Sequence, residues 1–249
     1  MSSVADMNVE PATLLDKQEQ RIRRMFGAIA PSYDLLNHLL SLNIDKYWRR
    51  RTTRLVEPRG SAPILDLCTG TGDLALAYDA VCSGRVPIFG TDFCHEMLVR
   101  AASKTDRRRA GERVRYLEAD AQQLPFPDNW FQISTVAFGL RNVTNTDRGL
   151  AEMVRVTQHS GRVAILEFSK PRHWLFGRLY QLYFRRLLPL IGQAISRSRD
   201  NAYRYLPASV IEFPDGEALA DRMRKHGLTY VRWQPLTFGI VTLYVGVKP

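Results

Sequence analysis

Between residues 63 and 168, short apolar runs alternate with amphipathic stretches, and this alternation limits the fold more than any other feature. Five runs have the length of buried strands: 63–67, 86–91, 114–117, 130–138 and 163–168. Three stretches between them have helical spacing: 74–81, 96–103 and 147–158. Strands that alternate with helices form a parallel sheet covered by helices on both faces. We therefore predict a Rossmann-like α/β fold.

The residues before this region are expected to be helical. Apolar side chains recur at positions i, i+3, i+4 and i+7 of one stretch, at Ile22, Met25, Phe26 and Ile29. This spacing places them on one buried face of a helix. We expect extra N-terminal helices that form a lid at 17–57, preceded by a flexible N-terminus at 1–16.

After the fifth strand the alternation stops and then resumes. Residues 172–200 are expected to form a helical insert, and a helix at 215–226 is followed by strands at 230–234 and 239–247. Because the last strand follows its predecessor closely, it should be antiparallel. The prediction is one domain at 17–249 with a seven-stranded, mostly parallel sheet.

Composition restricts the location and the partners of the chain. Lys and Arg number 35 and Asp and Glu number 25, and this net charge of +10 favours nucleic acid, acidic lipid surfaces or phosphorylated substrates. Three cysteines, with no C-x-x-C spacing, suggest neither a disulfide framework nor a zinc site, so no metal is expected. A polar N-terminus and the lack of a long apolar run predict neither a signal peptide nor a transmembrane helix, hence a cytoplasmic protein.

The glycine-rich stretch LDLCTGTGD at 65–73 follows the first strand and fits the G-x-G-x-x-G/A dinucleotide fingerprint. A tight turn without a ligand is one interpretation, and a dinucleotide site is another. Asp73 would lie in the first helical turn, where a pyrophosphate would otherwise bind. Asp66, at the end of the strand, suits the sulfonium and ammonium groups of S-adenosylmethionine. Asp73 is then either a second polar contact or a helix-start residue.

Acidic residues at the ends of the next two strands extend this site. Asp92 suits a ribose contact in either cofactor class, whereas Asp120 can accept from an adenine amino group while the Ala121 N–H reaches a ring nitrogen. The set resembles that of class I S-adenosylmethionine-dependent methyltransferases, although Cys68 replaces the first glycine of their usual motif. The candidate cofactor-binding residues are Asp66, Thr69, Gly70, Thr71, Gly72, Asp92, Phe93, Asp120 and Ala121.

The stretch FGLRNVTN at 138–145 indicates which class of molecule accepts the methyl group. It stands where methyltransferases of exocyclic base nitrogens carry a [DNS]-P-P-[YFW] signature, and no cysteine follows Cys94 to serve cytosine C5 chemistry. Arg141 and Asn142 should point from the end of the fourth strand over the cofactor. Arg141 could bind an oxyanion through charge-assisted hydrogen bonds, or could pair with a structural carboxylate.

The sequence resembles the menaquinone/ubiquinone biosynthesis C-methyltransferases over nearly its whole length, from about residue 17. The matching blocks are MFGAIAPSYDLLNHLLSLNIDKYWRR, LDLCTGTGD, LPFPDNWF, FGLRNVTN, GRVAILEFSKP, YRYLPASVIEFP and LTFGIVTLYVGVKP. The resemblance implies cofactor contacts at Thr71, Asp92, Asp120 and Ala121. It also places Ala137, which has no polar side chain, where the family often has a serine that contacts the cofactor.

The resemblance implies C-methylation of a polyprenylated quinol, either 2-demethylmenaquinol or the equivalent ubiquinone precursor. Deprotonating a quinol hydroxyl puts electron density on the adjacent ring carbon, which can attack the methyl group. Arg141 would stabilise the oxyanion, since arginine makes a poor base. His38 or Asp34 could be the base, but His38 could equally be a packing residue. The candidate catalytic residues are Arg141, Asn142, His38, Asp34 and Tyr33.

The segment at 172–200 interleaves six arginines with aromatic and aliphatic residues and contains no acidic residue before Asp200. This composition suits a helix at a membrane interface that also covers the polyprenyl tail. A buried cap over the sheet and an RNA-binding surface are the alternatives, the latter with methylated RNA as product. We expect transient contact with an anionic membrane and no nucleic-acid partner. The alternative to an enzyme is a module that binds the cofactor without catalysis. The sequence allows a homodimer but does not specify the oligomeric state.

Overall fold

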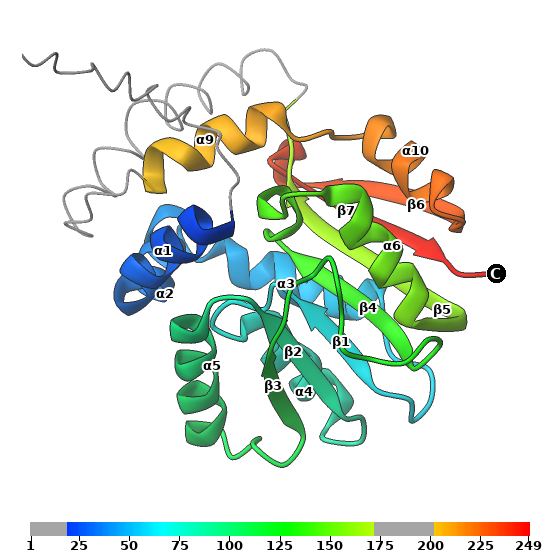
Figure 1. Cartoon of the computed structure of the whole chain (residues 1–249), viewed down its shortest axis with the longest axis horizontal. Helices are drawn as coiled ribbons and strands as arrows, with labels where there is room; N and C mark the ends of the chain where they lie inside the picture. The colour runs from blue at the N-terminus through cyan, green and yellow to red at the C-terminus, as the bar shows by residue number, and fades with distance from the viewer. Residues whose placement is uncertain (1–18, 172–201) are drawn as a thin grey trace, which may run out of the picture.

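The computed structural model describes residues 19–171 and 202–249, which form a seven-stranded sheet (Figure 1). The strand order is β3-β2-β1-β4-β5-β7-β6, with β1 to β5 parallel and β7 antiparallel to both of its neighbours. The strands are β1 (Ile64–Leu67), β2 (Ile88–Asp92), β3 (Val114–Glu118), β4 (Phe131–Ala137), β5 (Thr157–Phe168), β6 (Thr229–Leu236) and β7 (Val241–Val247). The predicted sheet, including its antiparallel C-terminal strand, is confirmed.

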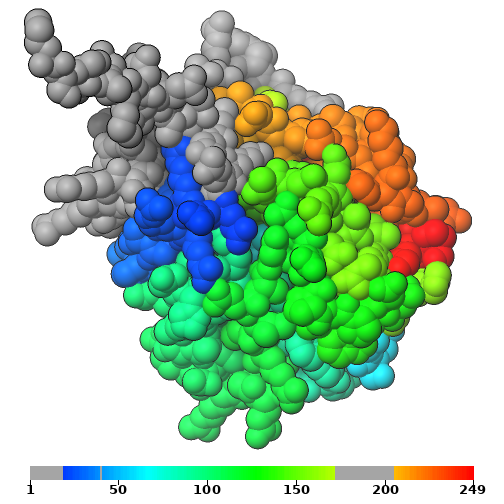
Figure 2. Space-filling model, viewed as in Figure 1, coloured from blue at the N-terminus to red at the C-terminus, as the bar shows by residue number. Residues whose placement is uncertain are grey.

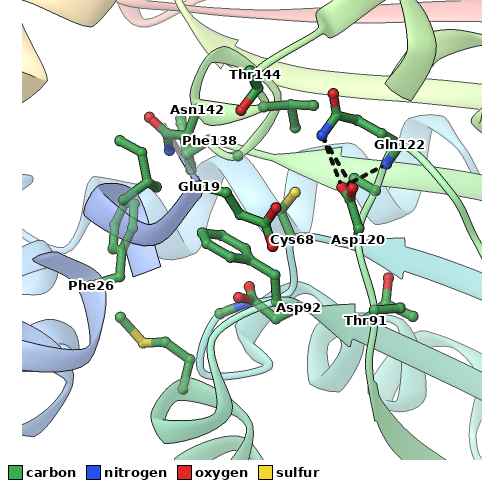
Figure 3. A pocket seen from close by; sticks show the side chains of 18 of the residues that line it. Glu19, Phe26, Cys68, Thr91, Asp92, Asp120, Gln122, Phe138, Asn142 and Thr144 are labelled. Atoms are coloured by element: carbon green, nitrogen blue, oxygen red, sulfur yellow. Dashed lines mark hydrogen bonds between the residues drawn. The ribbon is translucent and has the colours of Figure 1, made fainter. Parts of the chain in front are cut away.

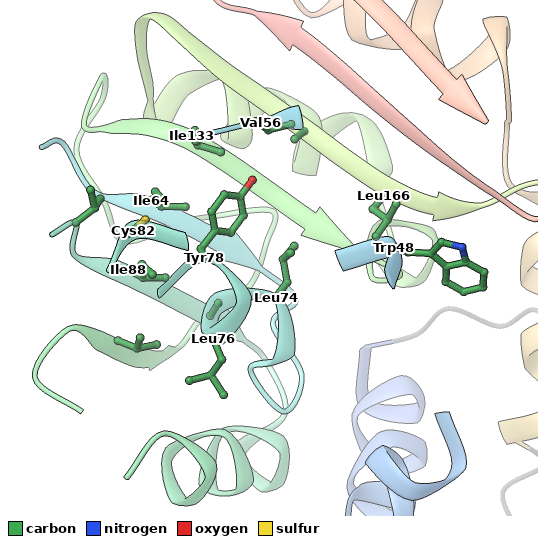
Figure 4. Packing of buried hydrophobic residues seen from close by; sticks show 14 of the residues in the cluster. Trp48, Val56, Ile64, Leu74, Leu76, Tyr78, Cys82, Ile88, Ile133 and Leu166 are labelled. Carbon is green, nitrogen blue, oxygen red and sulfur yellow. The ribbon is translucent and has the colours of Figure 1, made fainter. Parts of the chain in front are cut away.

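Helices cover both faces of the sheet because its central strands are apolar on both sides. All four residues of β1 are buried; Ile64 packs into one hydrophobic cluster and Leu65 into another. The first cluster includes side chains of α3 (Ile44–Leu55) and α4 (Asp73–Cys82), and Figure 4 shows Trp48 and Tyr78 within it. The second includes side chains of α6 (Thr146–Val156) and α10 (Glu217–Lys225). Fully burying such a side chain contributes about 1.5–3 kcal/mol.

The N-terminal helices are anchored by a third hydrophobic cluster. They are α1 (Glu19–Ile29), the short η1 (Ala30–Ser32) and α2 (Tyr33–Leu40). Buried side chains of α1 and α2 pack there with Met97 of α5 (His95–Arg107) and Tyr205 of α9 (Ala202–Glu212). Figure 2 shows the blue surface of this N-terminal region directly against the rest of the molecule. The expected N-terminal helices are therefore present.

Two local features differ from the sequence prediction. Helix α9 was not predicted, because Pro207 within it is a helix-breaking signal. Its buried Tyr205 and Val210 pack against the N-terminal helices, and this tertiary packing outweighs the local propensity. Helix α6 ends at Val156, earlier than expected, because Thr157 already pairs with Phe131 of β4.

Some predictions fall outside the described residues, namely the flexible segment at 1–16 and the helical insert at 172–200. Within the two described ranges, no helix combines the length and the apolarity needed to cross a bilayer.

Candidate active site

A cleft lies where the chain leaves the C-terminal ends of β1, β2, β3 and β4, and residues of α1 and α2 also line it (Figure 3). It encloses about 730 Å³, part of which is open to solvent. Seven of the predicted site residues line it: Tyr33, Gly70, Asp92, Phe93, Asp120, Ala121 and Asn142.

The glycine-rich loop approaches the cleft with its backbone in left-handed conformations. Gly70 and Gly72 have φ values of +56° and +80°, which glycine adopts without steric cost. The Gly70 N–H donates to Asp92 Oδ2 at 2.9 Å, so the loop is tied to the end of β2. A methyl group on Gly70 would lie 3.8 Å from Tyr33 Cε1 of α2, so the tyrosine ring packs next to the loop.

Cys68 replaces the first glycine of the motif and has a positive φ of 48°. Its side chain lines the cleft, and burial raises the pKa of the thiol well above its usual value. The cysteine packs against Gly139, where an added Cβ would lie only 2.3 Å from Cys68 Cβ. Gly139 is thus required because a side chain stands at position 68.

We expect Gly139→Ala to destabilise the protein by about 1–3 kcal/mol, the usual cost of overpacking a tight contact. It should also weaken S-adenosylmethionine binding, since Cys68 and Gly139 both line the cleft. Urea unfolding and calorimetric titration measure the two effects. The double variant Gly139→Ala with Cys68→Gly should recover most of the lost stability because it removes the opposing Cβ. Equal destabilisation of the single and double variants would contradict this coupling.

Asp92 and Asp120 present carboxylates to the cleft from neighbouring strand ends. Asp92 accepts from the Gly70 and Cys94 N–H groups, both at 2.9 Å, and burial raises its pKa to about 6. Asp120 accepts from the backbone N–H and the side-chain amide of Gln122, as Figure 3 shows. These hydrogen bonds hold both carboxylates in fixed orientations.

The charges on the wall of the cleft distinguish between the two cofactor interpretations. Among the described residues that line it, three are acidic, Glu19, Asp92 and Asp120, and none is lysine or arginine. Such a wall repels a pyrophosphate but suits a ligand with cationic groups and ribose hydroxyls. Apolar side chains such as Phe93 and Met97 provide surface for a base. The donor set therefore fits S-adenosylmethionine and not a dinucleotide.

The other predicted loop residues support the loop and do not line the cleft. Asp66 is buried, and its Oδ2 accepts from Thr69 Oγ1 at 2.6 Å and from the Ala75 N–H at 3.1 Å. Burial raises the pKa of Asp66 to about 7. The Gly72 N–H donates to the Thr69 carbonyl, and Gly72 caps α4. These bonds set the shape of the turn beside the cofactor.

Thr71 links the loop to the lid helices through a charged network. Its hydroxyl donates to Asp34 of α2 and accepts from Lys104 of α5 at 3.0 Å. Lys104 also pairs with Asp34 at 2.6 Å and with Asp73, the first residue of α4, at 2.7 Å. Asp34 is therefore engaged in anchoring α2 to the loop and does not line the cleft.

His38 lies in an adjoining cluster and also does not line the cleft. Its Nδ1 lies 2.8 Å from Asp45 Oδ2, and Arg49 pairs with the same carboxylate oxygen at 2.5 Å. Serine 41 donates to the other oxygen of Asp45, and the pKa of Asp45 is lowered despite its burial. The structure thus places His38 in an ion pair with Asp45 within the N-terminal helices, outside the described lining of the cleft.

The FGLRN block is divided between the cleft and the interior. Asn142 lines the cleft, whereas Arg141 is only 5% exposed and its Nη1 donates to Glu167 Oε1 of β5 at 2.7 Å. The guanidinium also lies 5.5 Å from the centroid of the Phe168 ring. Arg141 therefore points toward β5 rather than over the cofactor, and its partner is the structural carboxylate that the sequence had allowed.

Sequence reasoning missed several residues of the site. Gln122 and Phe138 line the cleft next to predicted residues, and their position in the same two blocks was the available signal. Glu19 and Phe26 reach the cleft from α1, which is distant in sequence. Glu167 is the penultimate residue of β5, as Asp66 is of β1, but its partner Arg141 is found only from the fold.

Comparison with known proteins identifies the class of this site. The model of the ubiE/COQ5 methyltransferase family matches residues 14–248. A protein of Citrifermentans bemidjiense named ubiquinone/menaquinone biosynthesis C-methyltransferase UbiE is 45% identical over 234 residues, which span 94% of this chain and 99% of that protein. The demethylmenaquinone methyltransferase of Thermus thermophilus is 47% identical over 225 residues, 90% and 100% of the two chains.

Solved structures of low sequence identity share the fold. The [4+2]-cyclase SpnF superposes with a TM-score of 0.69 at 16% identity, covering 92% of this chain and 96% of that one. An S-adenosylmethionine-dependent methyltransferase of Thermotoga maritima gives a TM-score of 0.65 at 17% identity, covering 92% and 100%. These likenesses concern the fold alone. The extensive match to the family model and to its members confirms the predicted family: the chain belongs to the ubiE/COQ5 methyltransferase family, and S-adenosylmethionine is its methyl donor.

Proposed function

We propose that this enzyme methylates a ring carbon of a polyprenylated quinol, converting 2-demethylmenaquinol to menaquinol. The observation that carries the proposal is a cleft whose described lining residues include three acidic side chains and no arginine. It occurs in a chain that is 47% identical to a demethylmenaquinone methyltransferase of Thermus thermophilus and 43% identical to one of Deinococcus radiodurans. Other relatives are named for both quinones, so the benzoquinol precursor of ubiquinone is the second candidate.

S-adenosylmethionine supplies an electrophilic methyl group when bound. Asp92 and Asp120 would hold its ribose and adenine, and Phe93 and Ala121 would cover the base. The acceptor ring would lie beside Tyr33 and Asn142, which line the same cleft. The ring carbon must be held about 3–3.5 Å from the methyl carbon for attack in line. Arg141 does not line the cleft, so its positive charge would favour the developing oxyanion from behind Asn142 and without direct contact.

The direct test is incubation of the protein with labelled S-adenosylmethionine and either demethylated quinol, followed by mass spectrometry of the lipid. We expect label on the naphthoquinol ring, with slower or no labelling of the benzoquinol. Labelling of the benzoquinol alone would favour the second candidate. Label recovered in RNA would contradict both, and the absence of basic side chains among the described cleft residues makes a nucleic-acid substrate unfavourable.

We also propose that the enzyme works at the cytoplasmic face of the membrane, where the prenyl tail of its substrate lies. Leu35, Leu39 and Leu42 recur at helical spacing along α2 and the turn after it, and they are 63%, 48% and 77% exposed. Lys46, Arg50 and Arg54 follow on the exposed side of α3. Apolar side chains flanked by basic ones suit an anionic bilayer surface. The basic segment at 172–200 supports the same proposal by its composition.

Replacing Leu39 and Leu42 by glutamate should abolish flotation with vesicles that contain anionic phospholipid. The exposed positions of both side chains leave the fold intact, which circular dichroism can check. The matched control replaces the exposed Ile211 of α9 and Val99 of α5 by glutamate, which should float normally. Unchanged flotation of the Leu39→Glu, Leu42→Glu variant would exclude this surface as the contact.

A further inference from the structure

Several buried polar atoms without a hydrogen-bond partner gather around η2 (Leu140–Asn142). Within the described part of the chain, the buried unpaired side-chain atoms include Arg141 Nε, Asn142 Oδ1, Glu167 Oε2 and Tyr205 Oη. They belong together because η2 contacts both β5, which carries Glu167, and α9, which carries Tyr205. An unpaired buried polar atom is costly, and a group of them indicates a polar ligand that completes their hydrogen bonds.

Glu167 is the group in this cluster that can accept a proton. Its Oε1 accepts from Arg141 Nη1 at 2.7 Å and from the Phe168 N–H at 2.9 Å, so this oxygen is held in place. Its Oε2 is free of partners, and the residue is only 1% exposed. A guanidinium is a poor base, and burial raises the pKa of the Tyr205 hydroxyl, so Glu167 is the candidate base of the cluster.

The cluster lies directly beside the cleft. Phe138 and Asn142, on either side of Arg141 in the chain, line the cleft, and Arg141 Nη1 donates to the Phe138 carbonyl. The other carboxylates near the cofactor have assigned partners: Asp92 binds the loop backbone, Asp120 binds Gln122 and Asp34 binds Lys104. Glu19 also lines the cleft, but it is an exposed residue at the start of α1.

We infer that Glu167 is the general base that takes the hydroxyl proton of the quinol, directly or through one water. This inference rests on the proposed function. The O–H bond breaks and its proton goes to Glu167 Oε2, while its electron pair moves into the ring. The adjacent ring carbon then forms a bond to the methyl carbon as the S–CH₃ bond breaks. That carbon finally releases its own hydrogen as a proton to solvent water. The proton held by Glu167 returns to the ring oxygen, which restores the aromatic quinol and the carboxylate.

The electrostatic surroundings of Glu167 suit this role. Burial raises its pKa, and the Arg141 guanidinium opposes that rise. Among the described residues, the titratable groups coupled electrostatically to Glu167 are Arg141 of η2, Tyr205 of α9, Cys68 of the loop after β1 and Tyr244 of β7. Burial raises the pKa of the Tyr and Cys groups, which keeps them neutral. A carboxylate with a raised pKa is a stronger base toward a phenolic hydroxyl than an exposed one.

The test compares Glu167→Gln with the wild-type enzyme in single-turnover methylation of 2-demethylmenaquinol at several pH values. A general base accounts for about 10²- to 10⁴-fold in rate, so we expect at least a 100-fold loss with S-adenosylmethionine affinity unchanged. The wild-type rate should fall at low pH as Glu167 becomes protonated. In Glu167→Gln this inflection should disappear, leaving a rate that rises steadily with hydroxide concentration. Glu152→Gln is the matched control, because Glu152 also pairs with an arginine at 2.7 Å but lies outside the site.

A second variant covers the case in which Glu167→Gln does not fold. Glu167→Asp keeps the carboxylate but shortens it, and should retain the pH inflection at a lower rate. A merely structural role would lower the rate without changing the shape of the pH profile, and that outcome overturns the inference. A 100-fold loss in Glu19→Gln, with Glu167→Gln active, also overturns it. If the wild-type enzyme methylates neither quinol, the proposed function fails, and the role of Glu167 fails with it.

Discussion

Replacing Arg141 by methionine is expected to lower the rate of methyl transfer about 100-fold or more, because it removes the guanidinium that holds Oε1 of Glu167, the inferred general base, in place. It should also destabilise the fold by about 3–5 kcal/mol, because the variant leaves Glu167 as a buried carboxylate without its counter-charge. The Arg141–Glu167 pair joins η2 to β5 with both side chains buried. A methyl-transfer assay measures the loss of rate, and urea unfolding at pH 8 measures the loss of stability.

The pH dependence of this destabilisation checks its cause. Burial already raises the pKa of Glu167, and loss of Arg141 removes the charge that opposes this rise. The folded variant therefore binds a proton that the unfolded chain releases, so its stability falls as pH rises above the usual pKa of a glutamate. The loss should be smaller at pH 5 than at pH 8. Equal losses at both values would contradict this account.

A double variant separates stability from activity. Arg141→Met together with Glu167→Gln removes both charges of the buried pair, and should recover much of the stability that Arg141→Met loses. It should not recover activity, since both the oxyanion stabiliser and the inferred base are missing. Recovery of methyl transfer in the double variant would show that Arg141 acts only by neutralising Glu167.

Replacing Asp92 by asparagine is expected to weaken S-adenosylmethionine binding about 100-fold, since a hydrogen bond to a charged group contributes about 1.5–3 kcal/mol. The carboxylate lies at the end of β2, lines the cleft and is fixed by the N–H groups of Gly70 and Cys94. Only its ionised form can accept from two ribose hydroxyls while it holds these backbone donors. Isothermal titration calorimetry of the apo protein measures the dissociation constant.

The same residue makes cofactor binding pH-dependent. Burial raises the pKa of Asp92 to about 6, so the wild-type dissociation constant should rise as pH falls through that value. Asp92→Asn should bind weakly at every pH and lack this dependence near pH 6. Asp221→Asn is the control, because Asp221 is an exposed acidic residue of α10, remote from the cleft. A wild-type affinity that is constant between pH 5 and 8 would contradict an ionised Asp92 in the complex.

Much of the architecture could be predicted because local patterns carry it. The apolar run of β1 is buried on both faces in any parallel sheet with two helical layers, and Asp66, Asp92 and Asp120 come at or just after the ends of their strands. Since the carboxyl ends of parallel strands share one edge, these acidic residues had to come close to one another. The sequence stretches that resemble the C-methyltransferase family then predicted methyl transfer as the reaction.

Contacts between distant segments could not be predicted in this way. Helix α9 contains Pro207, and it is stabilised by packing of Tyr205 with side chains of α1 and α2. The position of Asp34 depends in the same way on its ion pair with Lys104 of α5, which is distant in the chain.

The division is clearest at the FGLRN block. The sequence by itself determined that Arg141 follows the fourth strand at the catalytic edge of the sheet, and it allowed either an oxyanion or a carboxylate as partner. Only the tertiary structure decided the partner, because β5 lies beside β4 and brings Glu167 to 2.7 Å from the guanidinium. A buried charge must be paired, and the choice of partner depends on strand order rather than on any local pattern.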